Sequence, residues 1–136
     1  MRMHELHDIH EVLYCSLLSP DQPPQVVGRI VSRARARNAN EGITGLLVFD
    51  GQRFCQHVEG PREKVRSLMA RLEADRRHTD LCVLFEGSLA KRRYQRFEIG
   101  LAQVEEREDL ADMHSLQGAE ALQRFLLLRP RFDIAG

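Results

Sequence analysis

The chain has 136 residues, and its 43% hydrophobic content is enough to build the core of one ordinary domain. Its 20 basic and 20 acidic side chains cancel, so no overall field draws the protein to nucleic acid or to a membrane surface. No apolar run approaches the roughly 20 residues that span a bilayer, and the start of the chain lacks the apolar core of a signal peptide, so we expect a cytoplasmic protein.

Cysteine and histidine usage gives no clear metal or disulfide signal. The three cysteines are Cys15, Cys55 and Cys82. Their odd number and the absence of a CxxC pair favour reduced, buried thiols over disulfides or a zinc site. Three histidines recur every third residue near the start, at His4, His7 and His10. This spacing could chelate a metal, but no second ligand cluster follows, so we interpret residues 1–10 as a polar tail and expect no metal.

The first predicted elements are a strand and a helix. Val12–Ser16 is predicted to be a short strand. The segment SPDQPP then breaks the chain and supplies Asp21 as the N-cap of a helix with proline in its first turn. Apolar residues recur at helical spacing from Val26 to Ala34, and the helix should end near Asn38, a residue that tolerates left-handed geometry.

A hairpin follows this helix. Ile43–Phe49 is apolar on both faces, as a central strand would be, and the Asp-Gly pair after it is the strongest short hairpin signal. It should pair this strand antiparallel with Arg53–Glu59. Because successive side chains of a strand alternate between faces, Gln56 should lie with the apolar residues on one face and His57 should lie on the other.

The remaining elements complete the predicted fold. A second helix opens after Gly60 and stops around ADRRH, Leu81–Glu86 is a fourth strand, and Tyr94–Leu101 is a fifth with Phe97 and Ile99 on one face. The order β-α-β-β-α-β-β predicts an α+β, ferredoxin-like fold with a five-stranded mixed sheet and both helices on one face.

Residues 103–136 change in character. An acidic run precedes apolar residues at helical spacing, which predicts two short amphipathic helices broken near Gly118. A sheet with both helices on one face leaves the other face bare, and these helices would cover it. The alternative is a helix pair that binds a partner, and both roles can hold together. We therefore expect a tail (1–10), a domain (11–102) and a C-terminal helical extension (103–136).

Three polar residues are expected to meet on the helix-covered face: Tyr14 from the first strand, Gln56 from the third, and Asn38 from the end of the first helix. Each has an ordinary explanation by itself, as a core aromatic, a bonded core amide and a helix cap. Together, on an apolar face between two helices, they favour a ligand pocket. A primary amide has both donors and an acceptor, which suits a ligand with an amide-like edge.

Five blocks, YCS, RNANEGITGLLVF, FCQHVEGP, ADRRH and AKRRYQRF, resemble the BLUF family of blue-light sensors, which hold a flavin between two helices. The resemblance runs from about Glu11 to Ala102. It implies that residues 11–102 form a flavin-binding domain and that the protein is a photoreceptor rather than an enzyme, with FAD as cofactor.

The resemblance also implies roles for individual residues. Tyr14 would give an electron and a proton to excited flavin, and Gln56 would end rotated or tautomerised with a stronger hydrogen bond to the flavin carbonyl, which shifts absorption to the red. Asn38 would hold the pyrimidine-like edge of the ring. Further cofactor-binding positions are Arg37, Arg71, Asp75, His78 and Ile30.

One part of the family pattern differs in this chain. Most members have Trp followed two residues later by Met on the fifth strand, whereas this chain has Phe97 and Ile99 and no Trp. A swinging indole is therefore excluded, and the branched side chain of Ile99 stiffens the strand. The resemblance implies a signal through this strand and the C-terminal helices, with Phe97, Ile99 and His57 as relay residues.

The expected output is contact with an unknown protein partner or self-association, because we expect no output domain in the chain. Two alternatives stay open. The first is a degenerate BLUF-like interaction module with weak or no flavin binding and no photocycle. The second is an enzyme of acylphosphatase type, which would need an anion-cradling loop after the first strand, and SLLSPDQPP has no glycine-rich cradle.

Overall fold

The computed structural model describes residues 9–23, 25–101, 107–131 and 133–135, and the structural statements below refer to these residues. The strands are β1 (Ile9–Leu18), β2 (Thr44–Phe49), β3 (Arg53–Pro61), β4 (His78–Leu89), β5 (Phe97–Leu101) and β6 (Asp133–Ala135). The helices are α2 (Val26–Asn40), α3 (Arg62–Ala74), α4 (Arg107–Met113) and α5 (Gly118–Leu128), followed by a short 3-10 helix, Arg129–Arg131.

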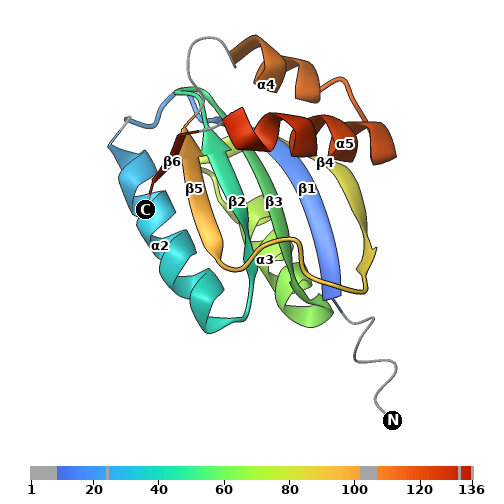
Figure 1. Cartoon of the computed structure of the whole chain (residues 1–136). Helices are drawn as coiled ribbons and strands as arrows, with labels where there is room; N and C mark the ends of the chain where they lie inside the picture. The colour runs from blue at the N-terminus through green and yellow to red at the C-terminus, as the bar shows by residue number, and fades with distance from the viewer. Residues whose placement is uncertain (1–8, 24, 102–106, 132, 136) are drawn as a thin grey trace.

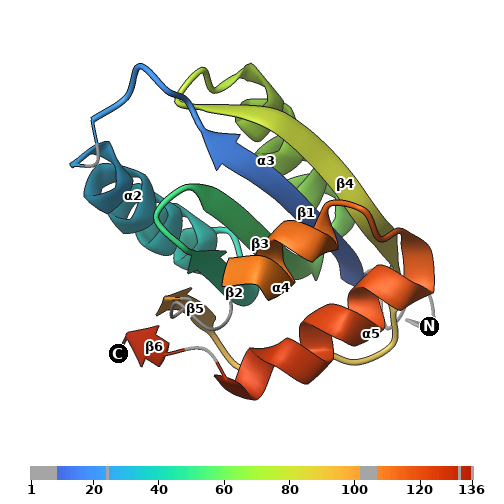
Figure 2. The ribbon, with the colours of Figure 1, turned by 90° about the horizontal axis from the view of Figure 1, so that it is seen from above.

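The strands form one mixed sheet in the order β4-β1-β3-β2-β5-β6. β5 pairs parallel with β2, and the other pairings are antiparallel. Helices α2 and α3 cover one face and α4 and α5 cover the other, which Figure 1 and Figure 2 show from two directions. The predicted α+β, ferredoxin-like fold is therefore confirmed. The short strand β6, at the edge beside β5, is an addition that the sequence did not predict.

The predicted hairpin joins β2 to β3. Phe49 and Phe54 are paired at its closed end, and Asp50 Oδ1 accepts hydrogen bonds from the backbone N–H groups of Gln52 and Arg53 at 2.9 and 2.6 Å. Gly51 has a φ of 100°, a conformation that other residues rarely adopt. Local turn chemistry therefore sets the register of the two central strands.

A second glycine lets β2 approach β3 closely. Gly45 has a φ of 154°, and a Cβ atom added there would lie 2.1 Å from the carbonyl oxygen of His57. Any side chain at this position would push the two strands apart, so Gly45 is part of what holds β3 in the middle of the sheet.

The ends of several elements differ from the prediction. Helix α2 begins at Val26 with Gln25 as an N-cap that makes no side-chain hydrogen bond, so Asp21 is not the cap. Proline disfavours the helical conformation in the residue before it, so the helix starts only after the prolines. At its other end the helix continues past Asn38 to Asn40, and positive φ is first reached at Gly42.

The strand ends also differ. Strand β1 begins at Ile9, so Ile9 and His10 belong to the sheet rather than to a tail, and the ring of His10 lies 3.0 Å from the carboxylate of Glu86. Strand β4 is longer than predicted because it pairs along most of β1, and β5 starts at Phe97 rather than Tyr94. His4 and His7 lie outside the described residues.

Each face of the sheet has its own hydrophobic core. Val58 of β3, Val65 and Leu68 of α3 and Phe97 of β5 belong to the core under α2 and α3. The other core packs the opposite side chains of the sheet against α4 and α5, with Phe125 fully buried in it. Helices α4 and α5 therefore cover the reverse face, as their amphipathic pattern predicted.

All three cysteines are free thiols. Cys15 and Cys55 are buried and Cys82 is half-buried, with the Sγ atoms of Cys15 and Cys55 3.3 Å apart across β1 and β3. Within the ranges given above, no group of three His, Cys, Asp or Glu residues is arranged to hold a metal ion.

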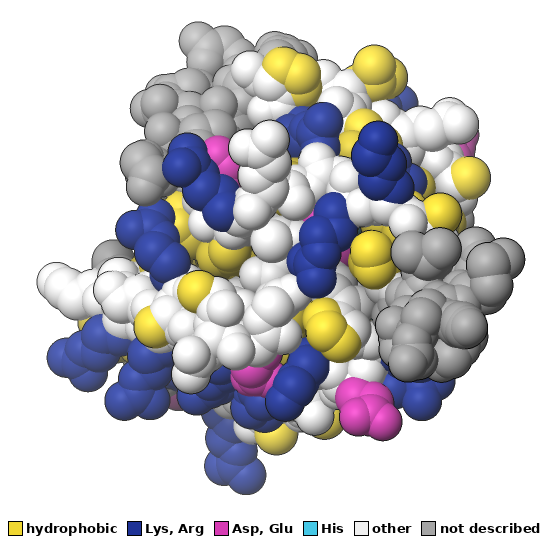
Figure 3. Space-filling view, turned by 60° about the horizontal axis from the view of Figure 1, so that its bottom comes forward, with side chains coloured by type: hydrophobic (Ala, Val, Ile, Leu, Met, Phe, Trp, Pro, Cys, Tyr) yellow, Lys and Arg dark blue, Asp and Glu magenta, His cyan; other side chains and the backbone are white. Residues whose placement is uncertain are grey.

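The molecular surface carries charge unevenly despite the zero net charge. Lys and Arg side chains are spread over the face in Figure 3, with few acidic side chains among them. Arg29, Arg33 and Arg37 of α2 are exposed. None of the helices that the structure describes is long and apolar enough to cross a membrane.

Candidate functional site between helices α2 and α3

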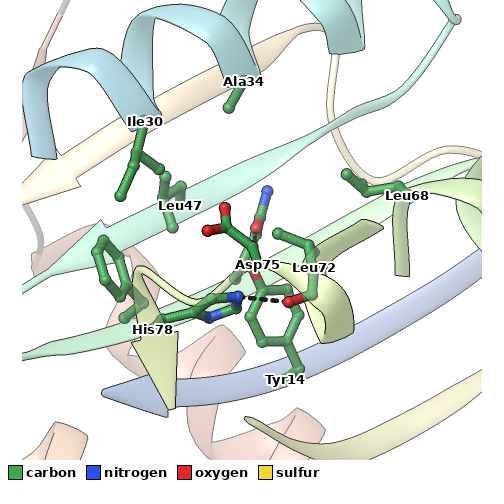
Figure 4. Close-up of a pocket in the computed structure, with 10 residues that line it drawn as sticks. Tyr14, Ile30, Ala34, Leu47, Leu68, Leu72, Asp75 and His78 are labelled. Atoms are coloured by element: carbon green, nitrogen blue, oxygen red, sulfur yellow. Dashed lines mark hydrogen bonds between the residues drawn. The ribbon is translucent and has the colours of Figure 1, made fainter. Parts of the chain in front are cut away.

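A cavity lies between α2, α3 and the sheet (Figure 4). Its space free of protein atoms, about 420 Å³, includes solvent at the open mouth. Its walls are mainly apolar. The lining residues are Tyr14, Ile30, Ala34, Leu47, Phe54, Gln56, Leu68, Leu72, Asp75 and His78.

Tyr14 and Gln56 meet on the sheet side of this cavity. They are direct partners across the β1–β3 pairing, and each is 3% exposed. The Tyr14 hydroxyl donates a hydrogen bond to Oε1 of Gln56. The carbonyl end of the carboxamide is therefore bonded to tyrosine, and Nε2 is its remaining donor. Burial raises the pKa of Tyr14, so the hydroxyl keeps its proton at physiological pH.

Asn38 is buried without a hydrogen-bond partner. The residue is 0% exposed, and neither Oδ1 nor Nδ2 has a partner among the described residues. Ile30, Ala34 and Asn38 are spaced four residues apart along α2, so Asn38 shares the helix face that lines the cavity. An unsatisfied buried amide costs about 1–3 kcal/mol, so this position suits a ligand that has both a donor and an acceptor.

Asp75 and His78 lie at the end of the cavity where α3 leads into β4. The carboxylate of Asp75 accepts from Nε and Nη2 of Arg77 at 2.9 and 2.6 Å, and these bonds lower the pKa of Asp75 although burial opposes them. His78 Nε2 donates to the carbonyl oxygen of Leu72 at 2.6 Å, which Figure 4 marks, and Nδ1 lies 2.9 Å from Oγ of Ser16. His78 therefore ties the end of α3 to β1.

The structure brings five of the eight predicted cofactor-binding residues together in one lining: Tyr14, Ile30, Gln56, Asp75 and His78. Asn38 lies one helical turn beyond the lining residue Ala34. Arg37 and Arg71 are not part of the lining. Arg37 is exposed, and Arg71 forms an ion pair of 3.1 Å with Glu41 while its buried Nε has no partner in the described part of the chain.

Some lining residues were not predicted as site residues, and all of them are apolar. Leu68 and Leu72 recur at helical spacing on α3, and Ala34 belongs to the predicted apolar pattern of the first helix. Their helical spacing was the available signal, but it did not separate residues that line a cavity from residues that fill a core.

The three predicted relay residues divide between the two faces of the sheet. Phe97 and Ile99 are buried in the core under α2 and α3, outside the cavity lining. His57 is fully buried on the reverse face, where its ring meets that of Phe125 edge-on at 5.8 Å between centroids. The predicted alternation of Gln56 and His57 along β3 is confirmed.

The fold and this cavity define an α+β module with a candidate small-molecule site beneath two helices. Comparison with known families gives the particular one: the family described as "BLUF: Sensors of blue-light using FAD" matches residues 9–100. The chain belongs to the BLUF family. The matched segment is a sensory module rather than an enzyme, and the family takes a flavin, which the unsatisfied amide of Asn38 and the apolar cavity walls suit.

Individual relatives agree with this assignment. The chain is 31% identical over 101 residues to the blue light- and temperature-regulated antirepressor BluF of Escherichia coli (strain K12), which covers 73% of this chain and 25% of that protein. The dark-state structure of the BLUF protein BlrB matches with a TM-score of 0.65 at 27% identity, covering 78% of this chain and 80% of that one.

A third relative is Klebsiella pneumoniae BlrP1, whose structure with FMN and cyclic diGMP matches with a TM-score of 0.64 at 30% identity. That match covers 76% of this chain and 29% of BlrP1. The chain thus spans only about a quarter of the length of BluF and of BlrP1.

Proposed function

We propose that this protein is a blue-light photoreceptor that binds FAD non-covalently between α2 and α3. The hydrogen bond from Tyr14 to Gln56 inside the cavity carries the proposal, because it places a protonated phenol and an adjustable carboxamide where a ligand would contact both. The fully buried amide of Asn38 adds a donor and an acceptor for the edge of the ring.

The choice of FAD is supported by the family description. The BlrP1 structure is described with FMN, so the comparisons support a flavin in general. The choice of FAD over FMN belongs to the proposal. We assign Arg37, Arg71, Asp75 and His78 to the rim of the site, where they would hold the ring edge, the ribityl chain or the phosphates. The buried Nε of Arg71, which has no hydrogen-bond partner among the described residues, supports this assignment for that residue.

The proposed photochemistry uses Tyr14 and Gln56. A bound flavin supplies absorption of blue light and accepts an electron when excited. Tyr14 would supply both this electron and its hydroxyl proton to the flavin, and both would then return to Tyr14. In the structure the hydroxyl donates to Oε1 of Gln56, so a rotated carboxamide would present Nε2 to the tyrosine oxygen and Oε1 to the ligand. The changed hydrogen bond shifts absorption to the red.

The proposed signal leaves the site through the sheet. Phe97 and Ile99 on β5 and His57 on β3 are the relay residues, and α4 and α5 are the elements that respond. The output is contact with a downstream protein or with a second copy of the chain, in the cytoplasm, where the three free thiols would stay reduced.

A second candidate function is a BLUF-like interaction module without a photocycle. It is favoured by Phe97 and Ile99, which pack into the core at the positions where most family members have Trp and Met. The two candidate functions predict different results for the purified protein: the photoreceptor should be yellow and change its absorption under blue light, and the interaction module should show no such change.

The test is an absorption spectrum of purified protein, supplemented with FAD, FMN or riboflavin in turn, before and after blue illumination. The photoreceptor proposal expects a yellow protein that retains FAD on gel filtration and shows a reversible red shift. A colourless protein that retains none of the three flavins would contradict the photoreceptor proposal. It would favour the second candidate function, the interaction module without a photocycle. Retention of FMN in place of FAD would overturn the assigned cofactor alone.

A further inference from the structure

A buried hydrogen-bonded network lies on the reverse face of the sheet, one residue from Gln56. His57 is 0% exposed and both of its ring nitrogens have partners: Nδ1 lies 2.7 Å from the hydroxyl of Tyr94, and Nε2 lies 2.8 Å from Oε1 of Glu11. Glu11 is 2% exposed and Tyr94 is 7% exposed. His57 and Glu11 are therefore shielded from water, whereas Tyr94 also borders an open surface pocket.

The protonation states give the network one direction. Burial opposes the charge on Glu11, but hydrogen bonds from His57 and Arg93 outweigh it and lower the pKa of Glu11, so this carboxylate only accepts. Burial raises the pKa of Tyr94, so its hydroxyl keeps its proton and donates to Nδ1. His57 then donates from Nε2 to Glu11, whose Oε1 also accepts from Nε of Arg93 at 3.0 Å.

The same network fixes the segment that leads into β5. The carboxylate of Glu59 on β3 accepts the backbone N–H groups of Arg93 and Tyr94 at 2.8 and 2.9 Å. It also accepts the hydroxyl of Thr44 on β2 at 2.6 Å. His57 and Glu59 lie two residues apart on the same side of β3, and both are fully buried. Glu59 holds one short loop by its backbone, and His57 holds it by the side chain of Tyr94.

The network also contacts helix α5 and the turn after it. Phe125 of α5 meets the His57 ring edge-on, and the guanidinium carbon of Arg129 lies 5.1 Å from the centre of the Tyr94 ring. A movement of either ring therefore acts directly on the helix that covers the reverse face.

We propose that the Tyr94–His57–Glu11 network is the relay that carries a rearrangement of Gln56 to α5, with His57 and Tyr94 as positioning residues; this rests on the proposed photoreceptor function. Gln56 and His57 share a peptide unit, so a backbone shift that follows the carboxamide also moves the imidazole. Because the imidazole is bonded at both nitrogens in a dry core, such a shift must move Tyr94 or break its hydrogen bond. A switch requires two states, and here they are the network with the Tyr94–His57 hydrogen bond formed and the network with this bond broken.

The apolar relay residues cannot do the same. Phe97 and Ile99 have no side-chain hydrogen-bonding group and can transmit only by packing. They also lie on the face opposite to α5. The hydrogen-bonded route crosses the sheet through the peptide unit that Gln56 and His57 share, and then reaches α5 through the His57 ring.

The test compares the wild-type protein, reconstituted with FAD, with Tyr94→Phe. This variant removes the donor to His57 and keeps an aromatic ring beneath Arg129. Ser19→Ala is the matched control, because it removes another buried hydroxyl, bonded to the carbonyl of Arg76 at 2.7 Å, outside the network. Two quantities are measured for each protein in the dark and under blue light: the absorption spectrum and the hydrogen exchange of the α5 backbone amides.

The relay predicts that wild type and Ser19→Ala show both the red shift and a light-induced change in α5 exchange. Tyr94→Phe should keep the red shift and lose the change in α5. In the flavin-free proteins, Tyr94→Phe should exchange its α5 amides about 2- to 10-fold faster than wild type, as expected for one lost hydrogen bond. Should Tyr94→Phe not retain flavin, Glu11→Leu removes the acceptor of His57 at the other end of the network and must give the same result.

Several outcomes would overturn the relay. It fails alone if α5 responds to light in Tyr94→Phe as in wild type, if Ser19→Ala loses the response too, or if wild type shifts in colour while α5 stays unchanged. It also fails if Tyr94→Phe loses the red shift, because the network would then act on the flavin site itself. A wild type that binds FAD without any red shift would instead contradict the photoreceptor proposal, and the relay with it.

Discussion

Gln56 and His57 are consecutive residues of β3 whose side chains enter opposite layers of the molecule. Gln56 accepts the hydrogen bond of Tyr14 in the cavity under α2 and α3, and His57 is buried against Phe125 of α5. A single strand therefore separates the candidate flavin site from the C-terminal helices. In the proposed relay, this proximity would let a change of one hydrogen bond act on α4 and α5 without a large movement of the domain.

Replacing Tyr14 with Phe should separate flavin binding from photochemistry. The variant removes the proposed electron and proton donor, and it leaves the buried Oε1 of Gln56 without the bond that it has in the wild type. We expect FAD to be retained, the light-induced red shift to be lost, and the free energy of unfolding to fall by about 1–3 kcal/mol. Light-minus-dark spectra and urea unfolding measure these effects. A full red shift in Tyr14→Phe would rule out the assigned role.

Asn38→Leu should have opposite effects on stability and on flavin affinity. The buried amide has no partner among the described residues, so an apolar side chain of similar size should stabilise the flavin-free protein by about 1–3 kcal/mol. The same change removes a donor and an acceptor from the site and should weaken flavin binding about 5- to 150-fold. Thermal unfolding without flavin and a fluorescence titration with FAD test both signs. Loss of stability together with unchanged affinity would contradict the assignment.

Glu11 should make the free energy of unfolding depend on pH in the acidic range. Burial tends to raise the pKa of this carboxyl, but hydrogen bonds from His57 and Arg93 lower it below its ordinary value of 4.5. A carboxyl with a depressed folded-state pKa contributes stability that is fully present above the ordinary pKa and is lost as pH falls through the folded-state pKa. The stability difference between wild type and Glu11→Gln should therefore be constant near neutral pH and shrink below about pH 4.5.

Urea unfolding of both proteins at a series of pH values provides the check. Asp112→Asn is a suitable control, because this carboxyl is exposed on α4. It should show no comparable decrease at low pH. A difference between wild type and Glu11→Gln that does not change down to pH 3 would mean that Glu11 is not held as a carboxylate.

Truncating Phe125 should show how strongly α5 is attached. Phe125 is 0% exposed in the core of the reverse face, and Leu127, two residues further along the same helix, is 73% exposed. Phe125→Ala should cost about 3–5 kcal/mol of unfolding free energy, and Leu127→Ala less than about 0.5 kcal/mol. Chemical denaturation measures both. Similar small losses for the two variants would indicate that α5 does not pack on the sheet in solution.

The sequence predicted those parts of the fold that local chemistry determines. The Asp-Gly turn predicted the β2–β3 hairpin, and alternation along β3 placed Gln56 and His57 on opposite faces. The apolar residues at helical spacing in the C-terminal extension indicated the helices on the reverse face. The start of α2 was wrong because a possible cap at Asp21 was weighed above the prolines that follow it. Strand β6 has only three residues, which is too short for a periodic pattern.

The candidate site was predicted less completely, because its parts come together only in the folded chain. The pairing of Tyr14 with Gln56 depends on the β1–β3 register, which joins residues 42 positions apart. The network around His57 needs Glu11 and Tyr94, which are 46 and 37 positions away from it. No short motif contains these three residues. Arg71 was predicted at the flavin, and its ion pair with Glu41 depends on a similar long-range contact.

The most direct measurement of the central claim is the light-minus-dark absorption spectrum of the FAD-reconstituted wild type beside that of Gln56→Leu. If Tyr14 and Gln56 form the photoswitch, the wild type should show a reversible red shift, and Gln56→Leu should keep its yellow colour and show none. A Gln56→Leu protein that still shifts to the red would contradict the account, because the carboxamide would then have no part in the response to light.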